Sequence, residues 1–138
     1  VFIFNTIGTT SGYFLAGSRA EIMDERGVMR RANLVRAILS LSLILVAVSA
    51  SVFILPFAVL ILVVMGLVYG FFLISSLSLS MELIPEGKAG VFYALMGLGG
   101  AFGCFLGTFV AERYGFPVLF AVVSVVFVLG YMAFKAYA

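Results

Sequence analysis

The sequence contains no histidine, a single cysteine and few charged residues. Without histidine the chain lacks the commonest metal ligand and the usual general base at neutral pH. The one cysteine, Cys104, lies inside an apolar run, which excludes an internal disulfide and a thiolate metal cluster. Only 10% of the residues are charged, whereas a soluble domain carries about 25%. We therefore expect no catalytic residue, metal site, cofactor or nucleic-acid partner, and we do not predict an enzyme.

Apolar residues are abundant instead, because 64% of the 138 residues are hydrophobic. A soluble domain carries roughly 45–50%, and a small soluble fold has too little interior to bury this excess. Disorder requires the opposite composition. The apolar runs are unbroken rather than alternating, which excludes the strands of a membrane barrel. The composition therefore predicts an all-α bundle of transmembrane helices whose main partner is the lipid bilayer.

The apolar runs divide the chain into five predicted spans. A helix needs about 20 apolar residues to cross a bilayer. The spans cover 1–16, 33–53, 56–80, 89–111 and 118–137, and a charged loop occupies 17–32. The first run is short, and we interpret it as the continuation of a helix that begins upstream. No charged residue lies near the centre of any of these spans, so they contain no clear acid for ion coupling.

The basic residues indicate how the spans are oriented. Seven of the eight lie in or beside the first loop, in the third loop and in the C-terminal tail, and Arg113 lies in the fourth loop. Cytoplasmic loops of membrane proteins are enriched in basic residues. The first loop, the third loop and the C-terminus are therefore predicted to be cytoplasmic, in a multi-pass protein of the plasma or inner membrane.

The charged loop contains an acid, a glycine and paired arginines. We interpret Gly27 as the residue that allows a tight return between two helices, and Asp24 as an acceptor for a helix N-terminus or an arginine. An alternative is that the arginines only anchor the loop at anionic headgroups. The loop residues that form this candidate cytoplasmic gate are Asp24, Arg26, Gly27, Arg30 and Arg31.

This loop resembles the G-x-x-x-D-R/K-x-G-R/K-R/K signature of major facilitator superfamily transporters. Asp24 and Gly27 match it in spacing, Ala20 stands where glycine is usual, and the arginines are shifted by one place. The resemblance implies that the chain is the C-terminal part of a twelve-helix transporter, about its eighth to twelfth helices. It also implies that the partners are the N-terminal half of the same protein, a small solute and in some members a coupling ion.

Under this resemblance, two helical bundles rock around a central solute site. The first, third and fourth spans line the cavity, and the second and fifth are more peripheral. A different class also fits the composition: a non-transporting receptor, scaffold or assembly subunit in which glycines only pack helices. Substrate-dependent flux separates the two classes.

Polar residues inside the spans are the candidates for a solute cavity, because polar groups at membrane depth face the protein interior or water. Serine and threonine can also bond to their own helix, whereas the amide of Asn5 has more hydrogen-bonding groups than its helix satisfies. Tyr69 lies near the middle of the third span. The cavity candidates are Asn5, Thr9, Tyr69 and Ser76.

Glycines recur at every fourth residue in three of the spans. Such spacing puts small residues on one helix face, where another helix can approach closely. The first and third spans carry one pair each, and the fourth span carries three. We interpret the fourth-span set as a packing or sliding surface. These glycines are Gly8 and Gly12, Gly66 and Gly70, and Gly99, Gly103 and Gly107.

Overall fold

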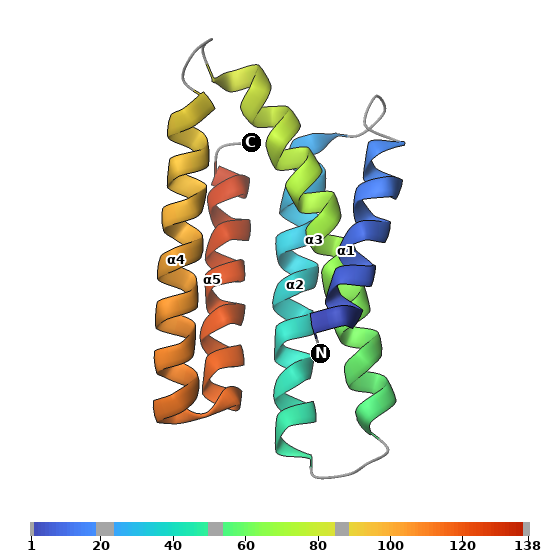
Figure 1. Cartoon of the computed structure of the whole chain (residues 1–138), viewed down its shortest axis with the longest axis vertical. Coiled ribbons are helices and arrows are strands. Elements are labelled where there is room, and N and C mark those ends of the chain that lie inside the picture. Colours follow the sequence, from blue (N-terminus) through green and yellow to red (C-terminus); the bar gives the residue numbers. More distant parts are fainter. Residues whose placement is uncertain (1, 19–23, 50–53, 85–88, 137–138) are drawn as a thin grey trace.

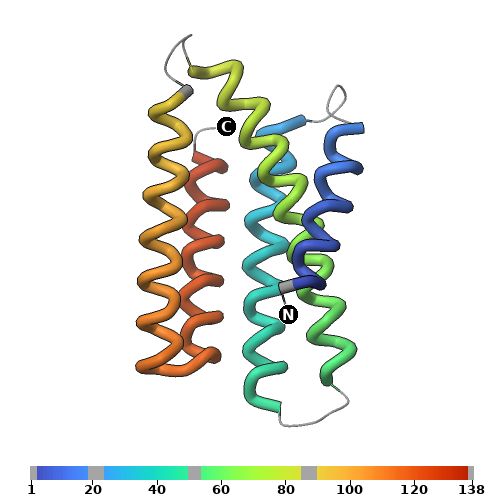
Figure 2. The backbone as a smooth tube through the Cα atoms, viewed as in Figure 1, coloured from blue at the N-terminus to red at the C-terminus, as the bar shows by residue number. Residues whose placement is uncertain are grey.

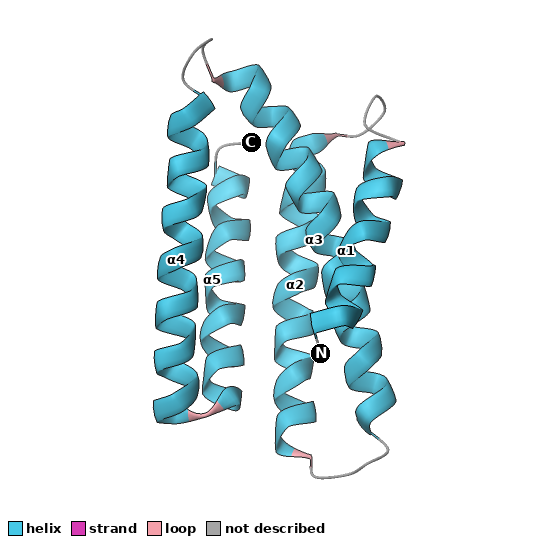
Figure 3. Cartoon of the chain, viewed as in Figure 1, coloured by secondary structure: helices cyan, strands magenta, loops and turns pink. Residues whose placement is uncertain are grey.

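The computed structural model describes residues 2–18, 24–49, 54–84 and 89–136. Its helices are α1 (Phe2–Gly17), α2 (Glu25–Val48), α3 (Leu55–Leu83), α4 (Ala89–Tyr114) and α5 (Phe116–Ala136). The described ranges contain no strand, which confirms the predicted all-helical class (Figure 3). By length and composition, four of these helices, α2 to α5, can cross a membrane, whereas α1 is described over 16 residues. The chain is therefore a membrane-embedded helical protein.

The order of the helices in space differs from their order along the chain. α1 packs on α3, α3 on α2, α2 on α5, and α5 on α4. Figure 1 shows the α4–α5 hairpin beside α2, with α3 crossing α2 obliquely, and the tube in Figure 2 follows the same path. α2 and α4 begin at the end of the bundle that contains Glu25, where α1, α3 and α5 finish (Figure 1). We call this the Glu25 end.

The second helix begins earlier than the sequence predicted. α2 begins at Glu25, so the second half of the predicted loop 17–32 is helical, and residues 19–23 lie outside the described part. Asp24 occupies the N-cap position and Glu25 the first turn, where acidic side chains complement the positive end of the helix dipole. Helix formation therefore starts with these polar residues, whereas hydropathy locates only the apolar part. Predicted span ends at residues 50–53 and 137 also lie outside the described residues.

A single glycine forms the turn between α4 and α5. Gly115 has a φ of +84°, a left-handed conformation that glycine adopts without a steric penalty. Its amide donates to the carbonyl oxygen of Ala111 at 3.0 Å, and Pro117 follows in the first turn of α5. The predicted loop 112–117 is therefore much shorter than expected, and Glu112 and Arg113 belong to α4.

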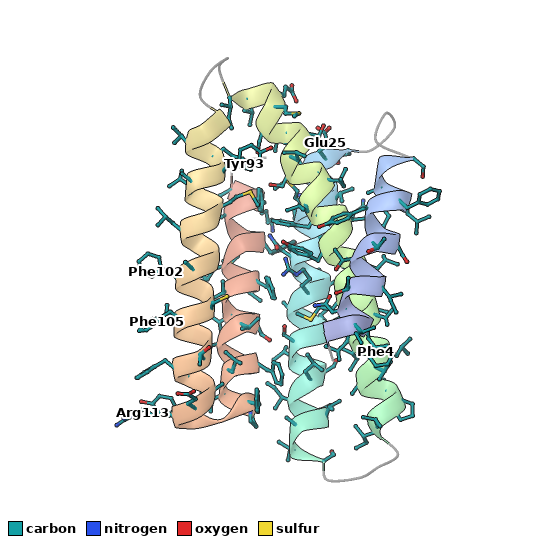
Figure 4. The ribbon with its side chains drawn as sticks, in the orientation of Figure 1. Phe4, Glu25, Tyr93, Phe102, Phe105 and Arg113 are labelled. Atoms are coloured by element: carbon teal, nitrogen blue, oxygen red, sulfur yellow. The ribbon has the colours of Figure 1, made fainter. Side chains whose placement is uncertain are left out.

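Burial is concentrated on α2 rather than on α4. α2 lies between α3 and α5 and carries more buried residues than any other helix of the described chain. α4 packs mainly on α5, and its described side chains are exposed or half-buried. Phe102 and Phe105 project outward from α4 and are 65% and 72% exposed (Figure 4). Within the described helices α2 is therefore central, because it packs on α3 and α5; that the second and fifth spans are peripheral in a whole transporter stays a prediction.

Candidate functional site

The middle of the bundle contains a charged side chain, Arg36, among aromatic rings. Its guanidinium carbon lies 4.1 Å from the ring centre of Phe127 on α5. The ring centres of Tyr69 and Phe72 on α3 lie at 5.1 and 5.6 Å. Arg36, Tyr69 and Phe127 each lie near the middle of their helix. Three helices thus bring one positive charge and three aromatic rings together halfway along their length.

Small and polar residues bring α2 close to α5 on either side of Arg36. The hydroxyl of Ser124 reaches the carbonyl oxygen of Ala37 at 3.3 Å as well as the carbonyl oxygen of Phe120 in its own helix. One turn away, the amide nitrogen of Asn33 lies 3.1 Å from the position that a Cβ on Gly130 would occupy. These contacts fix the register of the two antiparallel helices, and Arg36 faces the ring of Phe127 as a result.

The described part of the chain does not provide an acceptor for every N–H donor of Arg36. Its Nε atom is buried and has no hydrogen-bond partner there. Cation–π contacts contribute about 0.5–2 kcal/mol, whereas an arginine at the centre of a membrane helix costs about 2.5–3.5 kcal/mol on insertion scales. Three such contacts offset much of the cost of the charge, but they leave the Nε donor without an acceptor. Intramembrane charges of this kind mark functional sites.

Arg36 is the site residue that sequence reasoning missed. The expectation that no charged residue lies near the centre of a span is wrong, because it used a second span that begins at residue 33. α2 begins at Glu25, and Arg36 then falls in its middle. One feature of the sequence could have identified it. Arg36 lies inside the apolar stretch Leu34–Leu45, after the paired arginines of the charged segment.

The four predicted cavity residues lie at three different helix contacts. Tyr69 faces Arg36 at the α2–α3 contact. Asn5 and Thr9 lie between α1 and α3, where the hydroxyl of Thr9 donates to the backbone carbonyl of Asn5 at 2.9 Å. Ser76 lines a cavity of about 130 Å³ between α3 and α4, together with Tyr93. All four lie on or against α3, but only Tyr69 contacts the central charge.

The glycine pairs of α1 and α3 form a backbone-to-backbone contact between the two helices. A Cβ on Gly70 would lie 2.8 Å from the Cα of Gly12 and 2.8 Å from the carbonyl oxygen of Thr9. A Cβ on Gly66 would lie 2.6 Å from the side-chain oxygen of Asn5, and Gly8 meets the backbone of α3 in the same way. Here the four-residue spacing brings two backbones together, as predicted.

The glycines of α4 do not pack in this way within the described chain. A Cβ on Gly99 or Gly103 would meet no atom within 4 Å, and one on Gly107 would meet a Leu119 methyl at 3.9 Å. Gly103 and Gly107 instead line an apolar cavity of about 220 Å³ between α4 and α5. The predicted packing at this stripe is therefore not found between the described helices, because α4 has a neighbour mainly on its α5 side.

The predicted gate residues gather on the first turns of α2. Arg26 lines a cavity of about 390 Å³ with Leu79 and Leu83 of α3 and two residues of α5. Arg30 is half-buried and Arg31 is exposed. The sequence did not predict that Glu25 accepts a hydrogen bond from the hydroxyl of Ser78 on α3. α2 is thus tied to α3 by a side-chain contact at the Glu25 end.

The structure does not give Gly27 the left-handed turn, or Asp24 the capping hydrogen bond, that the sequence of the charged loop predicted. Gly27 is helical, and the only described glycine with a positive φ is Gly115. The carboxylate of Asp24 lies against Gly27, so a Cβ at that position would clash with it. Asp24 makes no side-chain capping hydrogen bond. The predicted left-handed turn at Gly27 is therefore wrong, and the missing side chain instead leaves space for the carboxylate of Asp24 above the first turn of α2.

We expect Ser78→Ala to destabilise the Glu25 end. The change removes the donor to Glu25, and the expected loss is about 1 kcal/mol of unfolding free energy. Ser80→Ala is the matched control, because its hydroxyl donates at 2.6 Å only to the Ser76 carbonyl of its own helix. Thermal unfolding in detergent measures both variants. Equal stability losses in the two would contradict an interhelical role for Ser78.

Comparison of the chain with models of protein families, with curated protein sequences and with solved structures finds no match.

Proposed function

We propose that this chain is part of a membrane transporter that moves a small solute by alternating access, and that Arg36 and Tyr69 belong to its solute site. The observation that carries the proposal is the guanidinium of Arg36 in the middle of an apolar bundle. It lies 5.1 Å from the Tyr69 ring, and its Nε has no hydrogen-bond partner in the described ranges. A cation inside the membrane that lacks hydrogen-bond partners lowers the stability of the protein, and transporters place such groups on the path of their solute.

The arrangement at the Glu25 end supports the same proposal. The first turns of α2 carry the acid, glycine and arginines that resemble the gate motif of major facilitator superfamily transporters, and Glu25 bonds to Ser78 of α3. A contact between helix ends is suited to opening and closing access, because it can break while the middle of the helices stays packed. We propose that this end is cytoplasmic, in line with its basic residues.

In the full transporter, we propose that a second bundle completes the solute pathway. The exposed side chains of α4, Phe102 and Phe105 among them, leave this helix with a free face toward lipid or toward that bundle. The chain's membrane is proposed to be the plasma or inner membrane. A static role in helix assembly is the second candidate, and the glycine contact between α1 and α3 favours it.

The test is uptake by proteoliposomes of labelled organic acids, amino acids and sugars, with Tyr69→Leu compared with the unaltered protein. We expect Tyr69→Leu to lower uptake of the transported solute roughly tenfold, the equivalent of about 1.4 kcal/mol from one lost contact. Asn5→Leu should instead lower thermal stability, because Asn5 fills the space at Gly66.

The matched control is Tyr114→Leu, which changes an exposed tyrosine at the end of α4. Its uptake should equal that of the unaltered protein. If no solute in the panel enters the vesicles above the protein-free background, the transport proposal fails and the assembly role is favoured. If Tyr69→Leu transports normally, Tyr69 lies outside the solute site.

A further inference from the structure

We infer that Arg36 binds the carboxylate of a singly charged organic anion whose remaining part is apolar. This inference rests on the proposed function, because it names the class of solute that the same site takes. Three features of the described residues carry it: the single charge at the site, the buried Nε of the guanidinium that has no hydrogen-bond partner there, and the aromatic rings around it.

The charge at the site favours an anion with one negative charge. The aromatic rings that contact the guanidinium within the described chain are those of Tyr69, Phe72 and Phe127, and they carry no formal charge. The nearest arginine along α2 is Arg31, about 7.5 Å away along the helix axis and exposed. One buried cation is neutralised by one carboxylate, whereas a phosphate dianion would leave an uncompensated charge in an apolar environment.

The geometry of a guanidinium favours a carboxylate in particular. Aromatic rings interact with the charge through their faces, but they do not fill the N–H donors that lie in the guanidinium plane. The Nε of Arg36 is one such donor, and it has no partner in the described chain. A carboxylate can accept two parallel, charge-assisted hydrogen bonds from this edge, and these are stronger than hydrogen bonds to an uncharged acceptor.

The rings indicate what the rest of the solute is like. Phe72 and Phe127 belong to different helices and present apolar surface beside the guanidinium. An aromatic or aliphatic group attached to the carboxylate would replace water against these rings, whereas a sugar would leave hydroxyls without partners there. Tyr69 adds a phenolic hydroxyl, which can donate to or accept from a solute oxygen.

The experiment measures binding and uptake of three monocarboxylates and their uncharged amides by the full-length protein. The probes are acetate with acetamide, benzoate with benzamide and octanoate with octanamide, together with inorganic phosphate. Binding is read from the rise in melting temperature in detergent, which follows ligand affinity. We expect benzoate and octanoate to bind, their amides and phosphate to bind at least tenfold more weakly, and acetate to be weaker than benzoate.

Variants locate the binding. Arg36→Gln is expected to weaken benzoate binding about 100-fold, and Arg36→Lys about tenfold, because lysine keeps the charge but lacks the planar fork. Arg113→Gln is the matched control, since it removes an exposed arginine from the end of α4 and should bind benzoate as the unaltered protein does (Figure 4). If Arg36→Gln does not fold, the carboxylate–amide comparison on the unaltered protein and the Arg36→Lys variant decide the question.

Any of these results overturns the inference: amides that bind as well as the acids, phosphate that binds more tightly than benzoate, or an Arg36→Gln protein that folds and binds benzoate normally. Absence of binding for all three acids also overturns it. Failure of the transport proposal can be distinguished from failure of the carboxylate inference. Benzoate that binds through Arg36 but never enters vesicles refutes transport alone, whereas uptake of a neutral solute without carboxylate binding refutes the inference alone.

Discussion

Replacing Gly70 with leucine is expected to separate α1 from α3 and to lower the unfolding free energy by about 3 kcal/mol. Even a Cβ at this position would lie 2.8 Å from the Cα of Gly12, and backbone cannot move aside as the end of a side chain can. Overpacking of this kind typically costs 1–3 kcal/mol, and a backbone clash belongs at the upper end of that range. Gly70→Ala should show the same effect at a smaller size.

Gly103→Leu is the matched control, since it makes the same chemical change in a transmembrane helix. A Cβ at Gly103 would meet no atom within 4 Å, so we expect unchanged stability and unchanged membrane insertion. The measurement is thermal unfolding in detergent for the three variants and the unaltered protein. Wild-type stability of Gly70→Leu would show that α1 and α3 are not in contact in the protein. A large loss for Gly103→Leu would show that another helix covers α4.

Replacing Arg36 with methionine is expected to abolish transport while the protein stays as stable as before or becomes more stable. Methionine keeps a flexible stem of similar length against the rings of Phe72 and Phe127. It removes an insertion cost of about 2.5–3.5 kcal/mol and loses cation–π contacts of about 0.5–2 kcal/mol. Because Arg36 makes three such contacts, the lost cation–π energy and the removed insertion cost are of similar size, and the melting temperature should not fall.

Melting temperature and vesicle uptake, measured on the same preparation, separate a functional arginine from a structural one. Arg113→Met serves as the control, because Arg113 is exposed at the end of α4, and it should change neither quantity (Figure 4). A functional Arg36 gives loss of uptake with retained stability, as residues kept for activity at a cost in stability do. If Arg36→Met melts well below the unaltered protein, the arginine holds α2, α3 and α5 together, and the site proposal loses its main support.

The glycines show how far residue spacing alone can predict contacts between helices. Gly8, Gly12, Gly66 and Gly70 meet across α1 and α3, whereas Gly99 and Gly103 have the same spacing and face open space. The spacing places small residues on one helix face, which is a property of the helix alone. Whether a second helix lies against that face depends on how the five helices are arranged in space. The sequence of a single helix does not determine this arrangement.

The sequence by itself determined that this protein is a bundle of apolar helices and approximately which residues form each helix. The reason is that exposing polar backbone to lipid, or apolar side chains to water, costs free energy in each segment separately. It also singled out Tyr69, whose ring lies 5.1 Å from the guanidinium carbon of Arg36 in the structure. Only the tertiary structure decided that α2 lies between α3 and α5 and that Arg36 meets the rings of Tyr69, Phe72 and Phe127. Such contacts join residues up to 91 positions apart, and they depend on helix register and packing, which hydropathy and local spacing do not encode.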